Sequence, residues 1–262
     1  MLVDIVKAII LGIIEGITEF FPISSTGHLI LAGDFLNFSS ANQATFNISI
    51  QLGAMLAVLV LYFDFFKKTF APKNWFGKNM NNIIIAIFPA LVVGFLFHKL
   101  IKEYLFSTYT VIAALIVGGI IMLVTEKLIS HKPNTIKIEN ISYKQALIIG
   151  LCQCFAFWPG MSRSGSAIVG GLFAKLDHKT AAEFSFIIGV PLMFIAVIYE
   201  LLTSFANLAQ KDFLLIGIAF LVSFFFGIIA IRSLLNILNR FKLFPFAVYR
   251  IVLAIFIVLI SF

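Results

Sequence analysis

The sequence predicts an all-α polytopic integral membrane protein that forms a single membrane domain over residues 1–262. Three observations lead to this prediction: an apolar composition, six long apolar segments, and two further apolar stretches that are broken by proline and resemble each other. Together they predict an inverted-topology repeat. In this architecture each half contributes one re-entrant helical hairpin and three transmembrane helices.

The composition excludes a soluble globular domain. Hydrophobic residues make up 61% of the chain, charged residues only 12%, and the mean hydropathy is +1.07. A soluble domain carries about 25% charged residues, so this chain cannot cover a globule with polar surface. The net charge of +7 does not predict a nucleic-acid partner, because the lysines lie in loops between apolar segments, as is usual in membrane proteins. The expected environment is the lipid bilayer.

Six apolar segments are each close to the roughly 20 residues that a membrane-crossing helix needs. They are about 44–66, 83–101, 108–129, 184–203, 213–235 and 244–262.

Two other stretches, about 5–36 and 143–175, are broken by PISSTGH and PGMSRSG. Proline removes a helical hydrogen bond, and Ser/Gly clusters end helices. Irregular backbone at membrane depth is tolerated only inside the protein or along a cavity. We therefore expect two re-entrant hairpins; a full crossing with a kink is the alternative.

The two broken stretches also match each other at a separation of 138 residues. The matching pairs are Gly12 and Gly150, Glu15 and Gln153, Ser24 and Ser162, Thr26 and Ser164, Gly27 and Gly165, and Phe46 and Phe184. Pro22 and Pro159 miss this separation by one. Weak symmetry of this kind indicates an internal duplication, with repeat one at about 1–130, repeat two at about 143–262 and a cytoplasmic linker at about 130–143. Three spans per half is an odd number, so the second half is inverted.

The basic residues predict the orientation. On one side this topology places thirteen: Lys67, Lys68, Lys73, Lys78, Lys127, Lys132, Lys137, Lys144, Lys175, Lys179, Arg232, Arg240 and Lys242. The other side holds four: Lys7, Lys99, Lys102 and Lys211. Basic residues favour the cytoplasmic side, so the first hairpin opens to the outside. Arg163 and Arg250 are left within the membrane.

Glu15 and Glu19 are the acidic pair of the first hairpin. They are four residues apart, so on a helix their carboxylates share one face. Each costs at least about 2.5–3.5 kcal/mol to insert, and such groups usually mark function. The pair suits a metal site or acid/base chemistry; the alternative is that both side chains merely bond to the broken backbone.

Polar residues follow directly after Pro22. Ser24, Ser25 and Thr26 precede His28, and hydroxyls close to a histidine suggest a nucleophile with its base. The backbone N–H groups at the start of the next helix suit an anion. For one of the two serines, helix capping is the stronger interpretation.

The second hairpin contributes Ser162, Arg163 and Ser164. A guanidinium in the membrane suits a phosphate, which matches its planar fork; an internal salt bridge to Glu15 or Glu19 is the alternative. With the first hairpin, these residues predict a phosphoryl-transfer site at the repeat interface.

EGITEFFPISSTGH and PGMSRSG resemble the two signature motifs of the undecaprenyl-pyrophosphate phosphatase family, also called the bacitracin-resistance family. Further similar segments are Gln51-Leu52-Gly53, Glu183-Phe184-Ser185, Pro245-Phe246-Ala247 and Tyr249-Arg250, so the likeness covers the whole chain. The resemblance implies hydrolysis of undecaprenyl diphosphate to undecaprenyl phosphate and inorganic phosphate in the bacterial cytoplasmic (inner) membrane. It also implies recycling of the cell-wall lipid carrier, bacitracin resistance, and stimulation by a divalent cation such as Mg²⁺ or Ca²⁺. A homodimer is compatible with it.

Residue by residue, the resemblance covers Glu15, Glu19, Ser25, Thr26 and His28 in the first motif and Ser162, Arg163 and Ser164 in the second. Our hypothesis is that Ser25 attacks the terminal phosphorus with His28 as base, while Arg163 clamps the diphosphate. Glu15 and Glu19 bind the cation or orient His28. Ser24, Thr26, Ser162 and Ser164 contact the substrate, in a site that faces the outer side. Direct attack by water remains open.

A polyprenyl-phosphate transporter or flippase is the competing function, because inverted repeats and broken helices are transporter features. A second alternative, the acid-phosphatase-like membrane phosphatases, requires a histidine soon after Ser162-Arg163. The next histidine is His178, so that pattern fails.

Overall fold

The computed structural model describes residues 1–38, 43–105, 107–129, 136–204 and 210–261. These residues form helices and contain no strand. The α-helices are α1 Leu2–Thr18, α2 Ser25–Phe35, α3 Gln43–Leu61, α4 Phe63–Thr69, α5 Lys78–Leu105, α6 Thr108–Leu128, α7 Tyr143–Gln153, α8 Arg163–Phe173, α9 His178–Ser204, α10 Gln210–Phe241 and α11 Phe244–Ser261. Short 3-10 helices are η1 Pro72–Asn74, η2 Ile138–Asn140 and η3 Cys154–Phe157. Of the predicted linker at about 130–143, residues 130–135 lie outside the described residues.

Several helices are long and apolar enough to cross a membrane, as a multi-pass membrane protein requires. Among the described residues these are Lys78–Phe97, Thr108–Leu128, His178–Glu200 and Asp212–Phe241. They correspond to four of the six predicted segments. At 18 residues, α11 is about 27 Å long, just short of the roughly 30 Å hydrocarbon core.

The predicted span at about 44–66 needs correction. The helix α3 ends at Leu61, and α4 leaves it at an angle of 83°. Tyr62, between the two helices, has non-helical backbone angles of φ −113° and ψ 29°. The last turn of α4 carries Lys67 and Lys68. Because lysines favour the membrane surface over its interior, a turn at this point keeps their ammonium groups in water.

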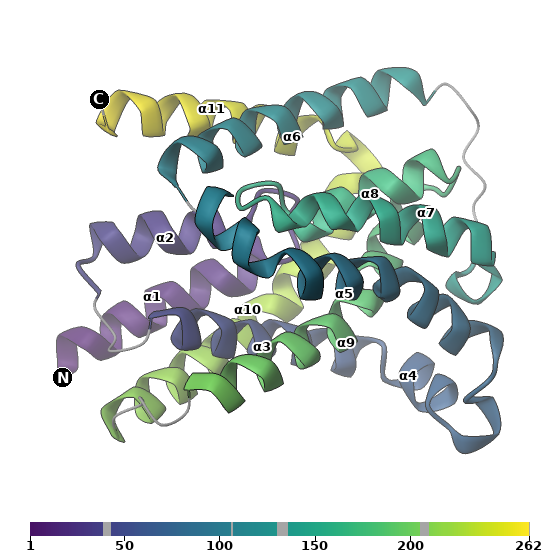
Figure 1. Cartoon of the computed structure of the whole chain (residues 1–262), viewed down its shortest axis with the longest axis horizontal. Helices are drawn as coiled ribbons and strands as arrows, with labels where there is room; N and C mark the ends of the chain where they lie inside the picture. The colour runs from purple at the N-terminus through teal and green to yellow at the C-terminus, as the bar shows by residue number, and fades with distance from the viewer. Residues whose placement is uncertain (39–42, 106, 130–135, 205–209, 262) are drawn as a thin grey trace.

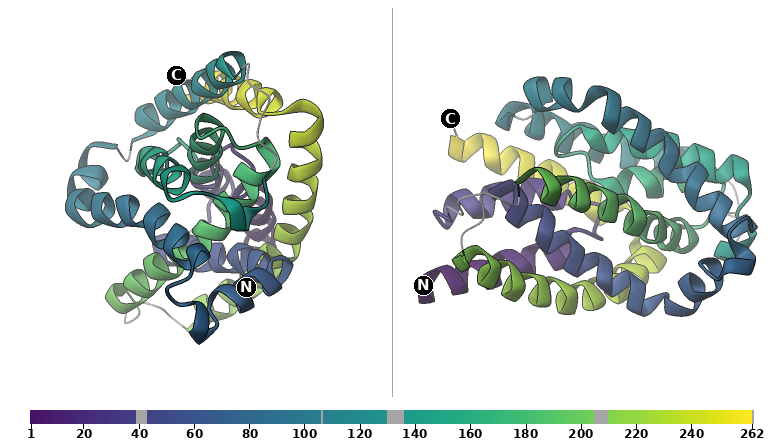
Figure 2. Two further views of the ribbon diagram at one scale, coloured as in Figure 1. Left: turned by 90° about the vertical axis from the view of Figure 1, so that its right-hand side faces the viewer. Right: turned by 60° about the horizontal axis from the view of Figure 1, so that its bottom comes forward.

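The two predicted hairpins are present as pairs of short helices. The helices α2 and α8 have 11 residues each, or about 17 Å, which is too short to cross a bilayer. The chain termini and the outer ends of α1 and α2 lie at one end of the bundle, while those of α7 and α8 lie at the opposite end (Figure 1). Seen end-on, the α7–α8 hairpin is surrounded by longer helices (Figure 2).

The short helices α2 and α8 have the same local geometry at both ends. Each begins after a serine with a positive φ, Ser24 at 72° and Ser162 at 73°, whose side chain accepts a hydrogen bond from the backbone N–H three residues later. After each helix the chain passes through another positive φ, at Asn37 (47°) and Lys175 (65°). Each of these positions in the first hairpin lies 138 residues before its counterpart in the second: Ser24 before Ser162, and Asn37 before Lys175.

Glycines allow the first helix of each hairpin to pack closely on a long helix. A Cβ at Gly12 on α1 would lie 2.6 Å from the carbonyl oxygen of Ala219 on α10, and one at Gly150 on α7 would clash with the carbonyl oxygen of Ala86 on α5. Small residues of this kind let helix backbones approach each other in membranes. The long helices thereby fix the depth of both hairpins.

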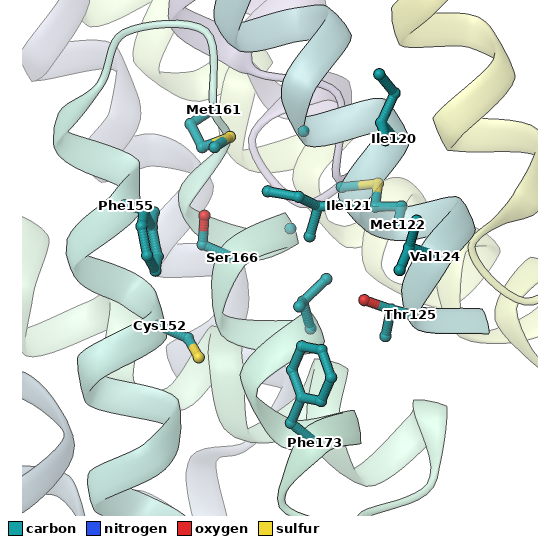
Figure 3. A pocket seen from close by; sticks show the side chains of 13 residues that line it. Ile120, Ile121, Met122, Val124, Thr125, Cys152, Phe155, Met161, Ser166 and Phe173 are labelled. Atoms are coloured by element: carbon teal, nitrogen blue, oxygen red, sulfur yellow. The ribbon is translucent and has the colours of Figure 1, made fainter. Parts of the chain in front are cut away.

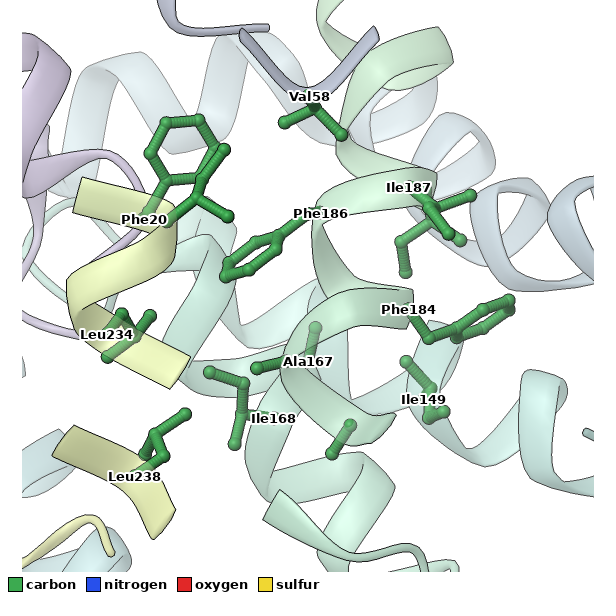
Figure 4. Close-up of a cluster of buried hydrophobic side chains, with 14 of the residues drawn as sticks. Phe20, Val58, Ile149, Ala167, Ile168, Phe184, Phe186, Ile187, Leu234 and Leu238 are labelled. Atoms are coloured by element: carbon green, nitrogen blue, oxygen red, sulfur yellow. The ribbon is translucent and has the colours of Figure 1, made fainter. Parts of the chain in front are cut away.

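Buried apolar side chains of α3, α8, α9 and α10 form a core with Phe20, which follows α1 (Figure 4). Phe20, the residue directly after Glu19, is fully buried and meets Phe186 of α9 edge-to-face, with ring centroids 5.2 Å apart. Val58 of α3 and Leu234 of α10 belong to the same cluster. Packed aromatic rings give Glu19 a rigid support.

The contact between α3 and α10 provides a stability prediction, because a Cβ at Gly53 would clash with the carbonyl oxygen of Phe220. We expect Gly53→Ala to lower the free energy of unfolding by about 1–3 kcal/mol through overpacking. Gly217→Ala is the matched control, since a Cβ there meets nothing within 4 Å and alanine favours helix. Thermal unfolding in detergent measures both; equal melting temperatures would contradict this packing.

Candidate active site

The carboxylate of Glu19 joins the two hairpins. Its Oε2 accepts a hydrogen bond of 2.6 Å from the Ser25 hydroxyl, and its Oε1 accepts one of 2.9 Å from Nη2 of Arg163. The side chains of Glu19 and Arg163 are only 4% and 8% exposed. Nη1 of Arg163 donates to the carbonyl oxygen of Ser185 on α9 at 2.9 Å. A hydroxyl and a guanidinium are thus held on one buried carboxylate.

Helix ends place these three side chains. Glu19 is the C-cap residue directly after α1, and Ser25 and Arg163 are the first residues of α2 and α8. Pro22, which cannot donate to a helical ladder, lies in the turn between α1 and α2. The first turns of α2 and α8 also leave backbone N–H groups without helical partners, an arrangement that suits an anion.

Glu15 lies one turn before Glu19 and is fully buried. Among the described residues no donor outside the acidic pair reaches its carboxyl oxygens; their side-chain contact is with the Glu19 carboxyl, and the charges of Glu19 and Arg163 act on them. A buried polar group without a donor is costly, so the Glu15 carboxyl is a candidate for coordinating a bound metal ion. Both oxygens of Glu19 are already engaged. Carboxylate oxygens suit Mg²⁺ or Ca²⁺, and Glu15 is the one that no donor outside the pair reaches among the described residues.

The structure places His28 beside Tyr249 and gives the Ser25 hydroxyl a different partner. Nδ1 of His28 lies 2.7 Å from the carbonyl oxygen of Ser24, and Nε2 lies 2.6 Å from the Tyr249 hydroxyl. The His28 and Tyr249 rings are stacked, with centroids 5.6 Å apart. A carbonyl only accepts, so Nδ1 carries the proton. The predicted pairing of Ser25 with His28 is therefore replaced in this structure by Ser25 with Glu19.

The remaining predicted site residues lie around this centre. Ser24 and Ser162 cap α2 and α8. For Ser24 this agrees with the capping interpretation of one of the two serines after Pro22; capping by Ser162 was not predicted. The hydroxyl of the fully buried Ser164 lies 3.2 Å from that of Ser162 and donates to the carbonyl oxygen of Phe21 at 3.3 Å. Thr26 is half-buried on the first turn of α2. Ser164 thus ties the second loop directly to the first.

Arg250 of α11 is a residue whose role the sequence left open. It is fully buried, and within the described part of the chain it donates five hydrogen bonds, each to a backbone carbonyl oxygen. Three of these carbonyls lie in the two loops: Pro22 at 3.3 Å, Gly160 at 2.9 Å and Met161 at 2.9 Å. The other two, Ala114 and Leu115, are on α6. Arg250 therefore satisfies carbonyls that the broken helices leave free, a role that only its place within the membrane hinted at.

Two glycines leave room for the arginines. A Cβ at Gly189 would clash with the guanidinium of Arg163, and one at Gly118 would clash with that of Arg250. Neither glycine belongs to a motif recognised in the sequence, because the close approach depends on tertiary packing.

An apolar cavity of about 340 Å³ lies between α6, α7 and α8 (Figure 3). Met122, Cys152, Met161, Val169 and Phe173 form much of its lining. Glu19, Ser25, His28 and Arg163 do not line it. The cavity is therefore lined by other side chains than the group formed by Glu19, Ser25, His28 and Arg163, which we call the polar cluster.

Comparison with known proteins agrees with the predicted family. The profile described as "Bacitracin resistance protein BacA" matches residues 8–256, and this range includes both hairpins and the whole polar cluster. The chain belongs to this family.

Similar BacA family members share sequence over nearly the full length. The chain is 44% identical over 256 residues to undecaprenyl-diphosphatase 1 of Bacillus thuringiensis subsp. konkukian, with 96% of each chain covered. It is 42% identical over 274 residues to undecaprenyl-diphosphatase of Exiguobacterium sibiricum, covering 97% of this chain and 96% of the relative. For undecaprenyl-diphosphatase of a Geobacillus species the identity is 41% over 273 residues, covering 100% and 99%.

Arg250→Met should destabilise the protein, because several buried carbonyls would lose their donor at about 1–3 kcal/mol each. We expect the melting temperature in detergent to fall by roughly 10 °C. Arg240→Met is the matched control, since Arg240 is exposed on α10, and it should change the melting temperature little. An unchanged melting temperature for Arg250→Met would contradict the inference that Arg250 holds the two loops to α6.

Proposed function

We propose that this BacA family protein hydrolyses undecaprenyl diphosphate to undecaprenyl phosphate and inorganic phosphate, which recycles the cell-wall lipid carrier and confers bacitracin resistance. The observation that carries the proposal is the buried Glu19 carboxylate, which holds the Ser25 hydroxyl at 2.6 Å and the Arg163 guanidinium at 2.9 Å. A hydroxyl, its proton acceptor and a cation are the parts that phosphoryl transfer needs. The names of the relatives support the substrate.

In the proposed first step, the Ser25 oxygen attacks the terminal phosphorus. Glu19 takes the hydroxyl proton through the hydrogen bond that already joins them. The bond between the terminal phosphorus and the bridging oxygen breaks, and undecaprenyl phosphate leaves with that oxygen. Attack by water, with Ser25 only binding phosphate, is the alternative that the variants below separate.

Arg163 stabilises the charge on the transferred phosphoryl group. Its guanidinium is held by Glu19 and by the Ser185 carbonyl, so it is oriented before the substrate binds. A preorganised cation in a poorly hydrated site is worth more than one in water. The hydroxyls of Ser24, Thr26 and Ser162 contact phosphate oxygens at the adjoining helix starts. The buried Ser164, expected from the sequence to contact substrate as well, instead donates a hydrogen bond to the Phe21 carbonyl and holds the second loop to the first.

His28 assists the second step, in which water removes the phosphoryl group from Ser25. With the proton on Nδ1, Nε2 carries the lone pair that accepts from the Tyr249 hydroxyl. We infer that a water molecule which displaces this hydroxyl gives a proton to Nε2 as its oxygen attacks phosphorus. The bond between phosphorus and the Ser25 oxygen breaks, Glu19 returns to that oxygen the proton that it took in the first step, and inorganic phosphate leaves. The carbonyl of Ser24 fixes the ring and therefore the tautomer.

A divalent cation, Mg²⁺ or Ca²⁺, fits the acidic pair. Glu15 would hold it through carboxyl oxygens that no donor outside the acidic pair reaches among the described residues, with Glu19 as its neighbour. A pair of carboxylates together with substrate phosphates is a common magnesium site. The cation would neutralise phosphate charge, and Glu15 would position it beside Arg163.

We further propose that the fold is an inverted repeat. The matching caps 138 residues apart and the opposite ends from which the two hairpins enter support this. The lysine-rich end would face the cytoplasm, which makes the bacterial inner membrane the site of action and opens the first hairpin to the outer side. There the diphosphate would lie at head-group level while its polyprenyl chain stays in lipid.

The direct test is release of phosphate from undecaprenyl diphosphate by the purified chain in detergent with Mg²⁺. We expect turnover for the wild type and a fall of about 100-fold or more for Arg163→Ala. Arg232→Ala, on the exposed face of α10, is the matched control and should keep full activity. A folded wild type that releases no phosphate would sink the proposal, and movement of the same lipid across vesicles would be measured next.

Ser25→Ala separates the two routes. If the serine is the nucleophile, phosphate release should fall by about 100-fold or more. Ser166→Ala is the control and should retain activity, because among the described residues the Ser166 hydroxyl donates its hydrogen bond to the carbonyl of Ser162. A Ser25→Ala enzyme near the wild-type rate would show that water attacks directly.

The substitution Glu15→Gln and the addition of a chelator should both impair binding of the divalent cation. We expect chelation to lower the wild-type rate by about tenfold or more, since metal neutralisation is worth several kcal/mol. Glu15→Gln should need a higher Mg²⁺ concentration for half-maximal rate. An unchanged Mg²⁺ dependence would remove Glu15 from the cation site.

A further inference from the structure

The segment between α3 and α5, here called the interfacial segment (residues 63–78), is not used by the proposed reaction. It begins where α4 bends away from α3 by 83° and lies at the end of the bundle opposite the termini (Figure 1). Large apolar side chains are exposed along it: Phe63, Phe70, Trp75 and Phe76, the last of them 93% exposed. Lysines alternate with these aromatics. Such a pattern is typical of a segment that lies in the membrane interface.

A small polar pocket of about 130 Å³ opens within this segment. It is lined by Lys68, Thr69, Asn74, Gly77, Lys78 and Asn79. Two of these residues are cationic, and no acid is among them. The charge of the lining therefore suits an anion.

The hydroxyl of Thr69 is the decisive feature of the pocket. Thr69 is only 2% exposed, and its Oγ1 has no hydrogen-bond partner among the described residues. The hydroxyl of a buried threonine usually finds a partner, and the neighbouring side chain of Asn74 does so by donating to the carbonyl oxygen of Lys68 at 2.7 Å. A phosphate oxygen in the pocket would give the Thr69 hydroxyl an acceptor.

The pocket also lies at the start of a long helix. The helix α5 has 28 residues, and the N–H of Asn81 is the first to reach back, to the carbonyl oxygen of Gly77 at 3.0 Å. The three preceding N–H groups therefore have no helical acceptor. Their dipoles add to the two lysines in attracting a negative charge.

From this geometry we propose that the pocket binds the phosphate of an anionic phospholipid headgroup. The lysines Lys68 and Lys78, the Thr69 hydroxyl and the first turn of α5 hold the phosphate. The exposed aromatic rings beside the pocket lie among the acyl chains of the same leaflet. A lipid is favoured over a free anion because the exposed Phe70, Trp75 and Phe76 directly adjoin pocket residues in the sequence, and because anionic leaflets attract basic segments.

Native mass spectrometry of the delipidated full chain in detergent tests the proposal, with phosphatidylglycerol and phosphatidylcholine of the same acyl chains as probes. We expect wild type to bind one phosphatidylglycerol at least about tenfold more tightly than phosphatidylcholine. The paired variant Lys68→Gln/Lys78→Gln should lose this preference. Thr69→Val, which keeps shape and charge, should weaken phosphatidylglycerol binding by about threefold or more, and Thr69→Ser should restore it.

The control pair Lys67→Gln/Lys73→Gln removes the same charge from exposed lysines outside the pocket. It should weaken binding by no more than about twofold. If both paired variants lost phosphatidylglycerol affinity equally, the lipid would bind a diffuse basic surface and the proposed pocket would be wrong. If neither variant lost affinity, the lipid would bind elsewhere on the protein, which would also overturn the proposal. Displacement of phosphatidylglycerol by excess inorganic phosphate would overturn the lipid as ligand.

Discussion

The site depends on one buried carboxylate. Glu19 receives a hydroxyl from its own hairpin and a guanidinium from the other, so its charge is balanced at a depth where an unpaired charge would be costly. The same carboxylate brings the proposed nucleophile, Ser25, and the proposed phosphate-binding cation, Arg163, to one point. Because Glu19 directly follows α1 and Ser25 and Arg163 begin α2 and α8, the geometry requires both helices to break where they do.

Broken helices in a membrane leave backbone groups that water cannot satisfy. In this chain, other side chains form hydrogen bonds with these groups. Arg250 donates to carbonyls of both loops and of α6, while Ser164 bonds to Phe21 of the facing loop. Glycines make this possible, since Gly118 and Gly189 give space to the two guanidiniums. The contacts that satisfy the loops also hold the segments that carry Ser25, Glu19 and Arg163, so the proposed catalytic arrangement depends on the same contacts as the stability of the loops.

Much of the fold and the membership of the polar cluster could be predicted from the sequence. Proline and small polar residues mark both breaks, and Arg163 pairs with Glu19, as the salt-bridge alternative held. The partners of the individual side chains could not be predicted. Ser25 bonds to Glu19 and His28 to Tyr249, which is 221 residues away, because such pairs depend on how distant helices pack. The bend at Tyr62 is not evident from the sequence either, because phenylalanines continue the apolar pattern after it and only Asp64 interrupts them.

The central claim is that Ser25 carries the phosphoryl group between the two steps. The most direct measurement is peptide mass spectrometry of the enzyme after acid quenching during turnover of undecaprenyl diphosphate, in wild type and in His28→Ala. Since His28 assists only the removal of the phosphoryl group, the account predicts phosphoserine at Ser25 that accumulates in His28→Ala. A His28→Ala enzyme that still releases phosphate slowly, with no phosphoserine at Ser25 at any time, would contradict it.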